Sequence, residues 1–276
     1  MNKIPFFLRL DDIAEPDPRM EQIVEETIKG QVPLLLSVVP ATMTLEVVKW
    51  LLQKQQAFPN LLEIGQHGYR HINHLKKGQR GEFGKTRSQQ LQHRDLKAGK
   101  RLMDEAFGKQ WSHIFVPPYN CYTRNTVRLL AAFGYRGVSA YHLPAQTPWD
   151  LLRALRDTFQ YLLGGNVPFH HNLYAMEGRL PCVSPALDAT KDYAQKIPLS
   201  EKELIRKTER ILLAGISVLG IMVHHWVYRT AQEVDSVIKG IGKIISKDVF
   251  EPTLPGSLMD RIASGKQGQF QKPGKE

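Results

Sequence analysis

The stretch "LLEIGQHGYRH" (61–71) joins a short apolar run to two histidines four positions apart. The run 61–66 has the length and composition of a buried strand, and Gly68 permits a sharp turn directly after it. Four residues is also the spacing of one helical turn, so the rings of His67 and His71 could face the same point. The spacing alone leaves two alternatives open: a metal site, or two histidines on a loop in a chain that has ten.

The alternation of an apolar run with an amphipathic stretch recurs along the whole chain. Strands are expected at 5–12, 33–39, 61–66, 112–118, 135–140 and 216–225, with a possible strand at 166–172. Helices are expected at 18–30, 44–55, 87–108, 125–134, 149–162, 200–215 and 231–245. Apolar strands that alternate with helices predict an α/β fold whose parallel sheet is covered on both faces. About seven strands favour a barrel over an open sheet.

Composition narrows the class of protein. The chain has 276 residues, of which 42% are hydrophobic, and we predict a single domain over 1–265 and a disordered tail over 266–276. The N-terminal residues do not form the apolar core of a signal peptide, and no apolar run is long enough to span a bilayer. We therefore expect a cytoplasmic protein without membrane insertion. Two cysteines are too few for a disulfide framework or a four-cysteine zinc site.

The formal net charge of +10 indicates either an anionic partner or a role in solubility. The basic residues are spread along the chain, and the sequence contains no nucleic-acid-binding signature. Nucleic acid is therefore not an expected partner. The sequence predicts no oligomeric state.

Acids and histidines stand where the expected strands end. They are Asp11 and Asp12, His67, and His224 with His225, and Tyr119 stands at the end of the fourth expected strand. The carboxyl ends of parallel strands lie at one rim, where such folds hold their ligands. Two imidazoles and one carboxylate make a three-ligand zinc or iron site with room for water, and a second carboxylate and a histidine could act as base and acid. A regular strand would point Asp11 and Asp12 to opposite faces, so both reach the site only if the strand breaks there.

The same stretches resemble the motifs of the polysaccharide deacetylase family, the NodB-homology group of carbohydrate esterase family four. "LRLDDI", "HGYRH", "FVPPYN" and "IMVHHW" resemble its first, second, third and last motifs, occur in the family's order, and lie between residues 9 and 226. The longer run "QHGYRHINH…GEFG…R" resembles an atypical bacterial branch. The resemblance implies a distorted (β/α)₇ barrel of parallel strands and the hydrolytic removal of an acyl group, acetyl first of all, from a sugar.

The resemblance also implies roles for particular residues. It makes Asp12, His67 and His71 the ligands of one divalent metal, with zinc expected. It makes Asp11 the catalytic base and gives the backbone N–H of Tyr119 a share in stabilising the oxyanion. His224 falls where the family has its general acid, and His225 stays an alternative because a one-residue shift reverses which ring faces inward.

Three positions depart from the family's pattern. Val116 stands where the third motif has an arginine that pairs with the base, and Gly68 stands where the second has Ser or Thr. The Asp-Trp segment that orients the acid has no clear counterpart, since 147–150 has those letters in the wrong order. Because Arg9 and Asp11 are two residues apart, a regular strand puts both on one face. We therefore predict that Arg9 takes over the role of the missing arginine.

The loop after the second motif bears on the substrate. "HLKKGQRGEFGKTR" (74–87) carries five Lys and Arg residues against one acid, Glu82. Such a loop on a catalytic rim would concentrate anions and could grip a phosphate or carboxylate. We therefore predict an acylated carbohydrate that bears an anionic group. Two alternatives are an amidase or cyclic-imide hydrolase of the same fold and a non-catalytic sugar-binding protein.

Overall fold

The computed structural model of the chain describes residues 3–75, 80–140, 152, 155, 174–175, 180–213 and 216–264. The predicted helix at 149–162 lies outside these residues except for Leu152 and Leu155, both of which are helical. The possible strand at 166–172 and the predicted tail at 266–276 also lie outside them.

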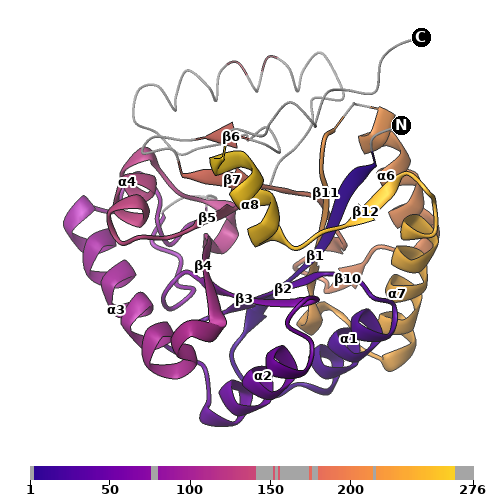
Figure 1. Cartoon of the computed structure of the whole chain (residues 1–276), viewed down its shortest axis with the longest axis horizontal. Helices are drawn as coiled ribbons and strands as arrows, with labels where there is room; N and C mark the ends of the chain where they lie inside the picture. Colours follow the sequence, from indigo (N-terminus) through magenta and orange to yellow (C-terminus); the bar gives the residue numbers. More distant parts are fainter. Residues whose placement is uncertain are drawn as a thin grey trace.

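Parallel strands form the main sheet, in the order β6-β7-β5-β4-β3-β2-β1-β11-β8, and β12 pairs with β1. Their bounds are β1 Ile4–Ile13, β2 Leu34–Val38, β3 Leu62–His67, β4 Trp111–Val116, β5 Gly137–Ser139, β6 Tyr174–Ala175, β7 Pro181–Val183, β8 Pro185–Asp188, β11 Leu219–His224 and β12 Phe250–Pro252. Among the strands that the structure describes in this sheet, only β6 runs antiparallel to its neighbour. The sheet curls into a nearly closed barrel with helices outside it (Figure 1), which confirms the predicted fold class.

The described helices follow the predicted ranges closely, except for α8, which was not predicted. They are α1 Pro18–Lys29, α2 Leu45–Ala57, α3 Gln89–Phe107, α4 Arg124–Ala132, α6 Glu201–Leu213, α7 Ala231–Ile245 and α8 Pro255–Ala263, with the short 3₁₀ turns η1 Gly108–Gln110, η2 Pro118–Asn120 and η4 His225–Val227. Side chains of Thr44, Ser88 and Thr123 accept backbone N–H bonds at the starts of α2, α3 and α4, which satisfies donors that a helix leaves free. None of the described helices is long and apolar enough to cross a membrane.

The strands are buried on both faces because helices cover the barrel outside and side chains fill it inside. Along β1, Phe6, Leu8 and Leu10 belong to the large core under the helices. Phe7 belongs to a second cluster with Leu35, Ile114, Val116 and Val183 from neighbouring strands, and with Leu258 and Met259 of α8. In Figure 1, α8 lies across the middle of the ring of strands. Because side chains alternate along a strand, Arg9 and Asp11 share the interior face with Phe7.

Several short elements were not predicted. They are β6, β7, β8, β12 and α8, together with a small hairpin of β9 (Thr190–Asp192) and β10 (Ile197–Pro198). The unpredicted strands have two to four residues each, too few to show a period, and most contain a proline, which usually argues against a strand. The expected strand 112–118 ends at Val116, because the next two residues are prolines and have no N–H to donate.

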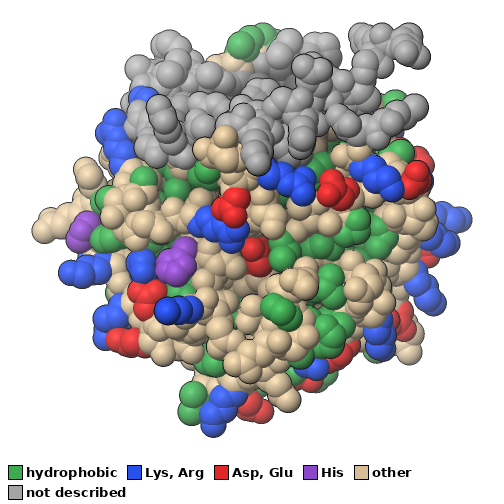
Figure 2. Space-filling view, in the orientation of Figure 1, with side chains coloured by type: hydrophobic (Ala, Val, Ile, Leu, Met, Phe, Trp, Pro, Cys, Tyr) green, Lys and Arg blue, Asp and Glu red, His purple; other side chains and the backbone are tan. Residues whose placement is uncertain are grey.

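Charged side chains of both signs are interspersed on the face of the molecule in Figure 2. The basic side chains visible on this face are therefore spread over it rather than gathered into one patch. The absence of a nucleic-acid partner stays a prediction.

Candidate functional site

Four strand ends bring the predicted polar residues to one rim of the barrel. Asp11 is paired in register with His224 on the neighbouring strand β11, and His67 at the end of β3 is paired with Val116 at the end of β4. The turn η2, which contains Tyr119, follows β4 directly. The structure thus brings together residues that are up to 213 positions apart in the sequence.

The end of β1 breaks at the acidic pair. The register between β1 and β2 shifts between Leu10 and Ile13, and Asp12 has a φ of 65°, a left-handed conformation that is uncommon for a residue other than glycine. Asp11 therefore stays on the interior face, and the Asp12 carboxylate is turned toward the histidines. Asp11 and Asp12 could both reach the site only if the strand broke between them, and the structure shows this break. Left-handed backbone at such a site carries strain that the surrounding structure must hold in place.

His67 and His71 meet across a tight loop, not along a helix. His67 ends β3, and the residues after it form no regular element. Gly68 has a φ of 62° and His71 a φ of 58°, so two left-handed residues reverse the chain within one short turn. The two ring centroids lie 4.9 Å apart. The helical interpretation of the four-residue spacing is therefore wrong, although the proximity that it predicted is present.

Asp12 lies between the two histidines. Its Oδ1 is 3.1 Å from His67 Nε2 and 3.0 Å from His71 Nε2, and one ligand atom from each of the three residues lies within 4.8 Å of the others. His67 Nδ1 is 3.1 Å from the carbonyl oxygen of Val116. A proton on Nδ1 that is donated to this carbonyl leaves the lone pair of Nε2 directed at Asp12. Two imidazoles and one carboxylate in this arrangement fit a catalytic zinc ion.

The charges of the three residues also suit a metal. Burial, followed by the neighbouring His67 ring, lowers the pKa of His71 to about 4, so this ring is neutral at pH 7. Burial opposes the charge of Asp12, but the hydrogen bond and charge of His67 outweigh it and hold the pKa of Asp12 far below its usual range. Burial likewise opposes the charge on His67, yet Asp11 and Asp12 raise its pKa above the usual value. Because a metal binds only the deprotonated Nε2, metal binding and protonation compete at His67.

Arg9 makes a two-pronged ion pair with Asp11 inside the barrel. Arg9 Nε donates to Asp11 Oδ1 at 2.9 Å and Nη2 donates to Oδ2 at 2.7 Å, and Arg9 is fully buried. Arg9 Nη1 also donates to the carbonyl oxygen of Ser139 at 2.9 Å. Burial alone would raise the pKa of Asp11, but the Arg9 guanidinium, helped by nearby histidines, holds it below its usual value. Val116, in the position of the family's arginine, packs in the interior apolar cluster.

The structure distinguishes the two histidines at the end of β11. His224 Nε2 lies 3.9 Å from Asp11 Oδ2 and 4.0 Å from Asp12 Oδ2. His225 begins the turn η4, and burial lowers its pKa against the charge of Asp17, the largest charge effect on this ring. Of the pair, His224 is therefore the one that faces both carboxylates.

Three residues around the other nitrogen of His224 were missed. Thr190 Oγ1 and the Tyr193 hydroxyl each lie 3.4 Å from His224 Nδ1, and Asp188 Oδ1 lies 3.9 Å from it. The Tyr193 hydroxyl also donates to Asp188. Asp188 ends β8, the strand beside β11, so an acid at a strand end was again the signal. The sequence did not predict this strand, because four residues that begin with a proline show no strand pattern.

Aromatic side chains border the same rim. Trp226 Nε1 donates to Asp12 Oδ2 at 2.7 Å, and the rings of Tyr193 and Trp226 lie 5.9 Å apart. The Tyr119 ring lies 4.5 Å from His71, and its hydroxyl donates to the His71 carbonyl oxygen at 3.0 Å. Trp226 therefore borders the rim and also donates a hydrogen bond to Asp12. The sequence did not predict this hydrogen bond. Tyr119 lies in the turn η2 and has a φ of 58°, so the backbone does not continue the direction of β4 there.

The basic loop differs from its prediction at one residue. The Arg87 side chain is 8% exposed and pairs with Asp95 of α3, so its guanidinium is not available to a substrate. Arg80 is exposed, and its charge acts on the Tyr119 hydroxyl by lowering its pKa against the stronger effect of burial. Lys76 and Lys77 lie outside the described residues.

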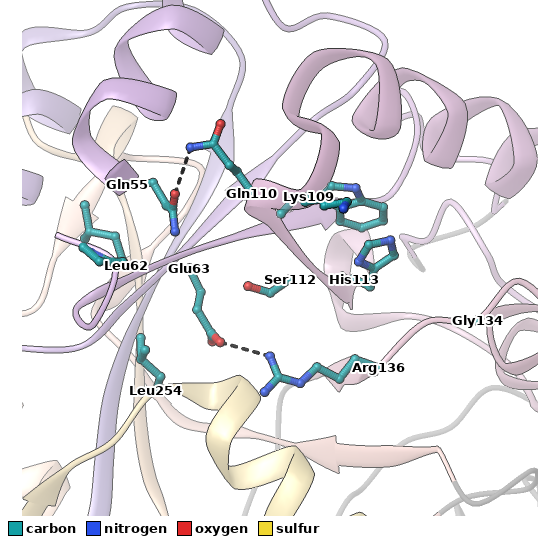
Figure 3. A pocket seen from close by; sticks show the side chains of 12 residues that line it. Gln55, Leu62, Glu63, Lys109, Gln110, Ser112, His113, Gly134, Arg136 and Leu254 are labelled. Carbon is teal, nitrogen blue, oxygen red and sulfur yellow. Dashed lines mark hydrogen bonds and ion pairs between the residues drawn. The ribbon is translucent and has the colours of Figure 1, made fainter. Parts of the chain in front are cut away.

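A cavity of about 460 Å³ lies where β3 and β4 begin, away from the rim with the histidines. Figure 3 shows Glu63 and Arg136 directed toward each other across it. Glu63 accepts the Gly256 N–H at 2.8 Å at the start of α8, and Arg136 pairs with Asp260 of the same helix. These charges are therefore engaged in holding α8 against the barrel. Within the described part of the chain, Asp12, His67 and His71 form the one group of potential metal ligands that was found.

Comparison with known sequences points to one family. Residues 48–138, about a third of the chain, match the family model of polysaccharide deacetylases. This stretch holds both histidines of the second motif and the whole third motif. No curated protein is similar enough in sequence to count as a match.

Solved structures share the fold at low sequence identity. A protein from Mycobacterium smegmatis described as a polysaccharide deacetylase is 12% identical, with a TM-score of 0.62 over 100% of this chain and 96% of that one. A family 4 acetyl xylan esterase from Clostridium thermocellum, solved with a cobalt ion, is 10% identical, with a TM-score of 0.55 over 92% and 90%. A pseudoenzyme of this family from Bacillus anthracis is 14% identical, with a TM-score of 0.53 over 94% and 66%.

The family model covers the second and third motifs, and the solved structures share the barrel fold. The resemblance is thereby confirmed: the chain carries a polysaccharide deacetylase match over residues 48–138 and has the barrel fold of the carbohydrate esterase family four structures.

Proposed function

We propose that the protein is a metal-dependent hydrolase that removes an acetyl or related acyl group from a carbohydrate. Since a pseudoenzyme has the same barrel, the fold alone is a weak argument for activity. The observation that carries the proposal is the site itself. Asp12, His67 and His71 lie within 4.8 Å of one another, beside a second carboxylate held by Arg9 and a histidine that faces both acids.

Asp12, His67 and His71 would hold one divalent ion, with zinc expected. Three protein ligands leave a position open to water or substrate. A zinc ion bound there would act as a Lewis acid toward the acyl carbonyl and would activate the attacking water. Trp226 fixes the orientation of Asp12 through its second oxygen, and the Val116 carbonyl fixes that of His67. Such outer contacts commonly set the affinity of a metal site.

Asp11 and His224 would move the protons of the reaction. Water adds to the acyl carbon and gives its proton to Asp11, which Arg9 keeps ionised. The bond from the acyl carbon to the sugar nitrogen or oxygen then breaks, and His224 donates a proton to that leaving atom. The backbone N–H of Tyr119 would donate to the oxygen that gains negative charge. The products are a carboxylic acid and a sugar with a free amine or hydroxyl group.

Asp188, Thr190 and Tyr193 would orient His224 as the acid. All three surround Nδ1, which leaves Nε2 facing Asp11 and Asp12. This cluster would fill the role of the Asp-Trp segment for which the sequence shows no counterpart. The rings of Tyr193 and Trp226 form a wall on which the apolar face of a sugar ring could lie.

Turnover of matched substrates tests the proposed function. The zinc-loaded protein is assayed with N-acetylated and O-acetylated sugars, with small linear amides and with a cyclic imide. We expect release of acetate from the sugars and its loss after removal of the metal. Turnover of the amides or the imide alone would instead identify an amidase of the same fold. Sugar binding without any turnover, in a protein shown to hold zinc, would identify a binding protein.

We also propose that the sugar substrate carries an anionic group such as a diphosphate. Arg80 lies close enough to Tyr119 to act on its hydroxyl, and Lys196 Nζ lies 5.9 Å from the Trp226 ring, so cations stand on two sides of the rim. The cytoplasmic location stays a prediction.

Replacing Arg80 by alanine should weaken the preference for a charged substrate. Removing one exposed cation should lower kcat/KM for the diphosphate form by about 3-fold to 5-fold, the range of a surface ion pair. The neutral form should be unaffected, and the difference should shrink as salt screens the interaction. The measurement is kcat/KM for substrates with and without the diphosphate at several salt concentrations. Arg101→Ala on α3 is the control, because its exposed side chain pairs with Glu105. Equal rates for the two substrates at low salt would contradict the proposal.

A further inference from the structure

Glu82 lies directly behind the turn that carries the metal-site histidines. Its side chain is fully buried, and both carboxylate oxygens face the backbone of that turn. Oε2 accepts the Tyr69 N–H at 3.0 Å and Oε1 accepts the Arg70 N–H at 2.8 Å. Burial raises the pKa of Glu82, and the neighbouring backbone of Arg70, Tyr69 and His71 opposes that rise. Two successive N–H groups therefore donate to one acid, the kind of concave backbone that binds anions.

The turn needs such an acceptor because of its shape. Gly68 and His71 are both left-handed, which directs the N–H groups between and after them to one side, into the protein. A buried N–H without a partner is costly, so removal of the carboxylate would destabilise this backbone path. The position of the His71 ring depends on that path, because His71 is the last residue of the turn and carries the strained φ.

Gly68 shows how Glu82 relates to the family's second motif. The family has Ser or Thr at this position. A Cβ atom on Gly68 would lie 2.2 Å from Glu82 Oε2 and 2.3 Å from Pro118 Cγ, far inside contact distance. The space that a hydroxyl-bearing side chain would need is therefore filled by the Glu82 carboxylate and Pro118. With Glu82 in this place, position 68 has room for glycine but not for the Ser or Thr that the family has there.

The loop around Glu82 is fastened at its base. Asn73 Oδ1 accepts the N–H of Leu75 at 3.0 Å and that of Gly81 at 2.9 Å. The N–H of His74 donates to the Gly81 carbonyl at 2.9 Å. Phe83, which follows Glu82, is fully buried and packs edge-on against Phe115 at 5.3 Å. These contacts hold Glu82 in place, so its carboxylate meets the turn in a fixed position.

We propose that Glu82 is a positioning residue of the metal site, which holds the turn from Gly68 to His71 so that the His71 ring faces Asp12. It takes the structural place of the Ser or Thr side chain that Gly68 lacks. The proposal rests on the proposed function in one respect, namely that Asp12, His67 and His71 bind a metal. What it adds is that Glu82, which would touch neither the metal nor the substrate, controls the affinity of the site for the metal.

The test is the affinity of the purified protein for Zn²⁺ and Co²⁺, measured by competition with a chromophoric chelator. Glu82→Gln keeps the size of the side chain but turns an N–H donor toward backbone donors. We expect about 10-fold to 100-fold weaker metal binding, the range for loss of an outer contact, and a changed visible spectrum of bound Co²⁺. Glu82→Asp, which keeps the charge but shortens the reach, should lose less.

Asp95→Asn is the matched control. Asp95 is a buried acid in the same region and pairs with Arg87, so its loss should lower thermal stability with little change in metal affinity. If Glu82→Gln is too unstable for titration, the rise in Tm that zinc produces is compared with that of the natural protein; a smaller rise supports the proposal. Unchanged affinity or an unchanged rise in Glu82→Gln overturns it. If the natural protein itself binds no metal at these side chains, the proposed function fails first, and that result is distinct.

Discussion

Replacing His71 by alanine is expected to abolish both metal binding and turnover. The change leaves Asp12 and His67 as the only protein ligands of the three that lie within 4.8 Å, and two ligands do not make the three-ligand site of a catalytic zinc ion. A catalytic metal contributes several kcal/mol to transition-state stabilisation, so turnover should fall by about 10³-fold or more. His67→Ala should have the same effect, with an added cost in stability because His67 is buried.

The measurement combines metal content by mass spectrometry with turnover before and after dialysis against a chelator. In the natural protein, zinc should restore the activity that the chelator removes, whereas His71→Ala should not recover. His74→Ala is the control, since His74 lies three positions further along the same loop and is not part of the metal-ligand group. It should keep both metal and turnover. Full turnover by a protein from which all metal has been removed would refute the metal-dependent mechanism.

The sequence predicted which residues lie together at the rim wherever the strand ends could be recognised. The apolar runs before Asp11, His67 and His224 are long enough to predict strands. Parallel strands that end in polar residues bring those residues to one rim. The break between Asp11 and Asp12 followed from the alternation of side chains in a strand. The contact between Arg9 and Asp11 followed from the same rule, because it depends on a separation of two residues.

The missed features depend on contacts between distant segments. Asp188 reaches His224 because β8 pairs with β11, and no pattern within four residues reveals a pairing partner. In the sequence Glu82 is the lone acid of a basic loop, yet in the structure it is buried and accepts the N–H groups of Tyr69 and Arg70. Arg87 looked available for a substrate and is instead paired with Asp95. In each case the sequence gives the charge of the side chain, whereas the folded chain shows which group that side chain contacts.

Replacing Arg9 by methionine should reduce turnover strongly while metal content stays unchanged. Arg9 contacts Asp11 through two hydrogen bonds and is not part of the metal-ligand group. Asp11 must be ionised to accept a proton, and Arg9 holds its pKa down against the effect of burial. Without Arg9, burial should raise that pKa, so a smaller fraction of the base is ionised at neutral pH. General-base catalysis contributes about 10²–10⁴-fold, so we expect a loss of about 10²-fold at pH 7.

The pH profile separates this effect from simple damage to the fold. The acid limb of kcat/KM reports the ionisation of Asp11 in the free enzyme, and it should move to higher pH in Arg9→Met, so that part of the turnover returns as the pH rises. Arg9→Lys keeps the charge but not the two-pronged contact, and it should move the limb back toward its natural position.

Arg136→Met, which removes an arginine that pairs with Glu63 and Asp260 at the other end of the barrel, should lower stability without moving the limb. An acid limb in Arg9→Met that stays where it is in the natural protein would show that Arg9 supports the barrel but does not set the ionisation of the base.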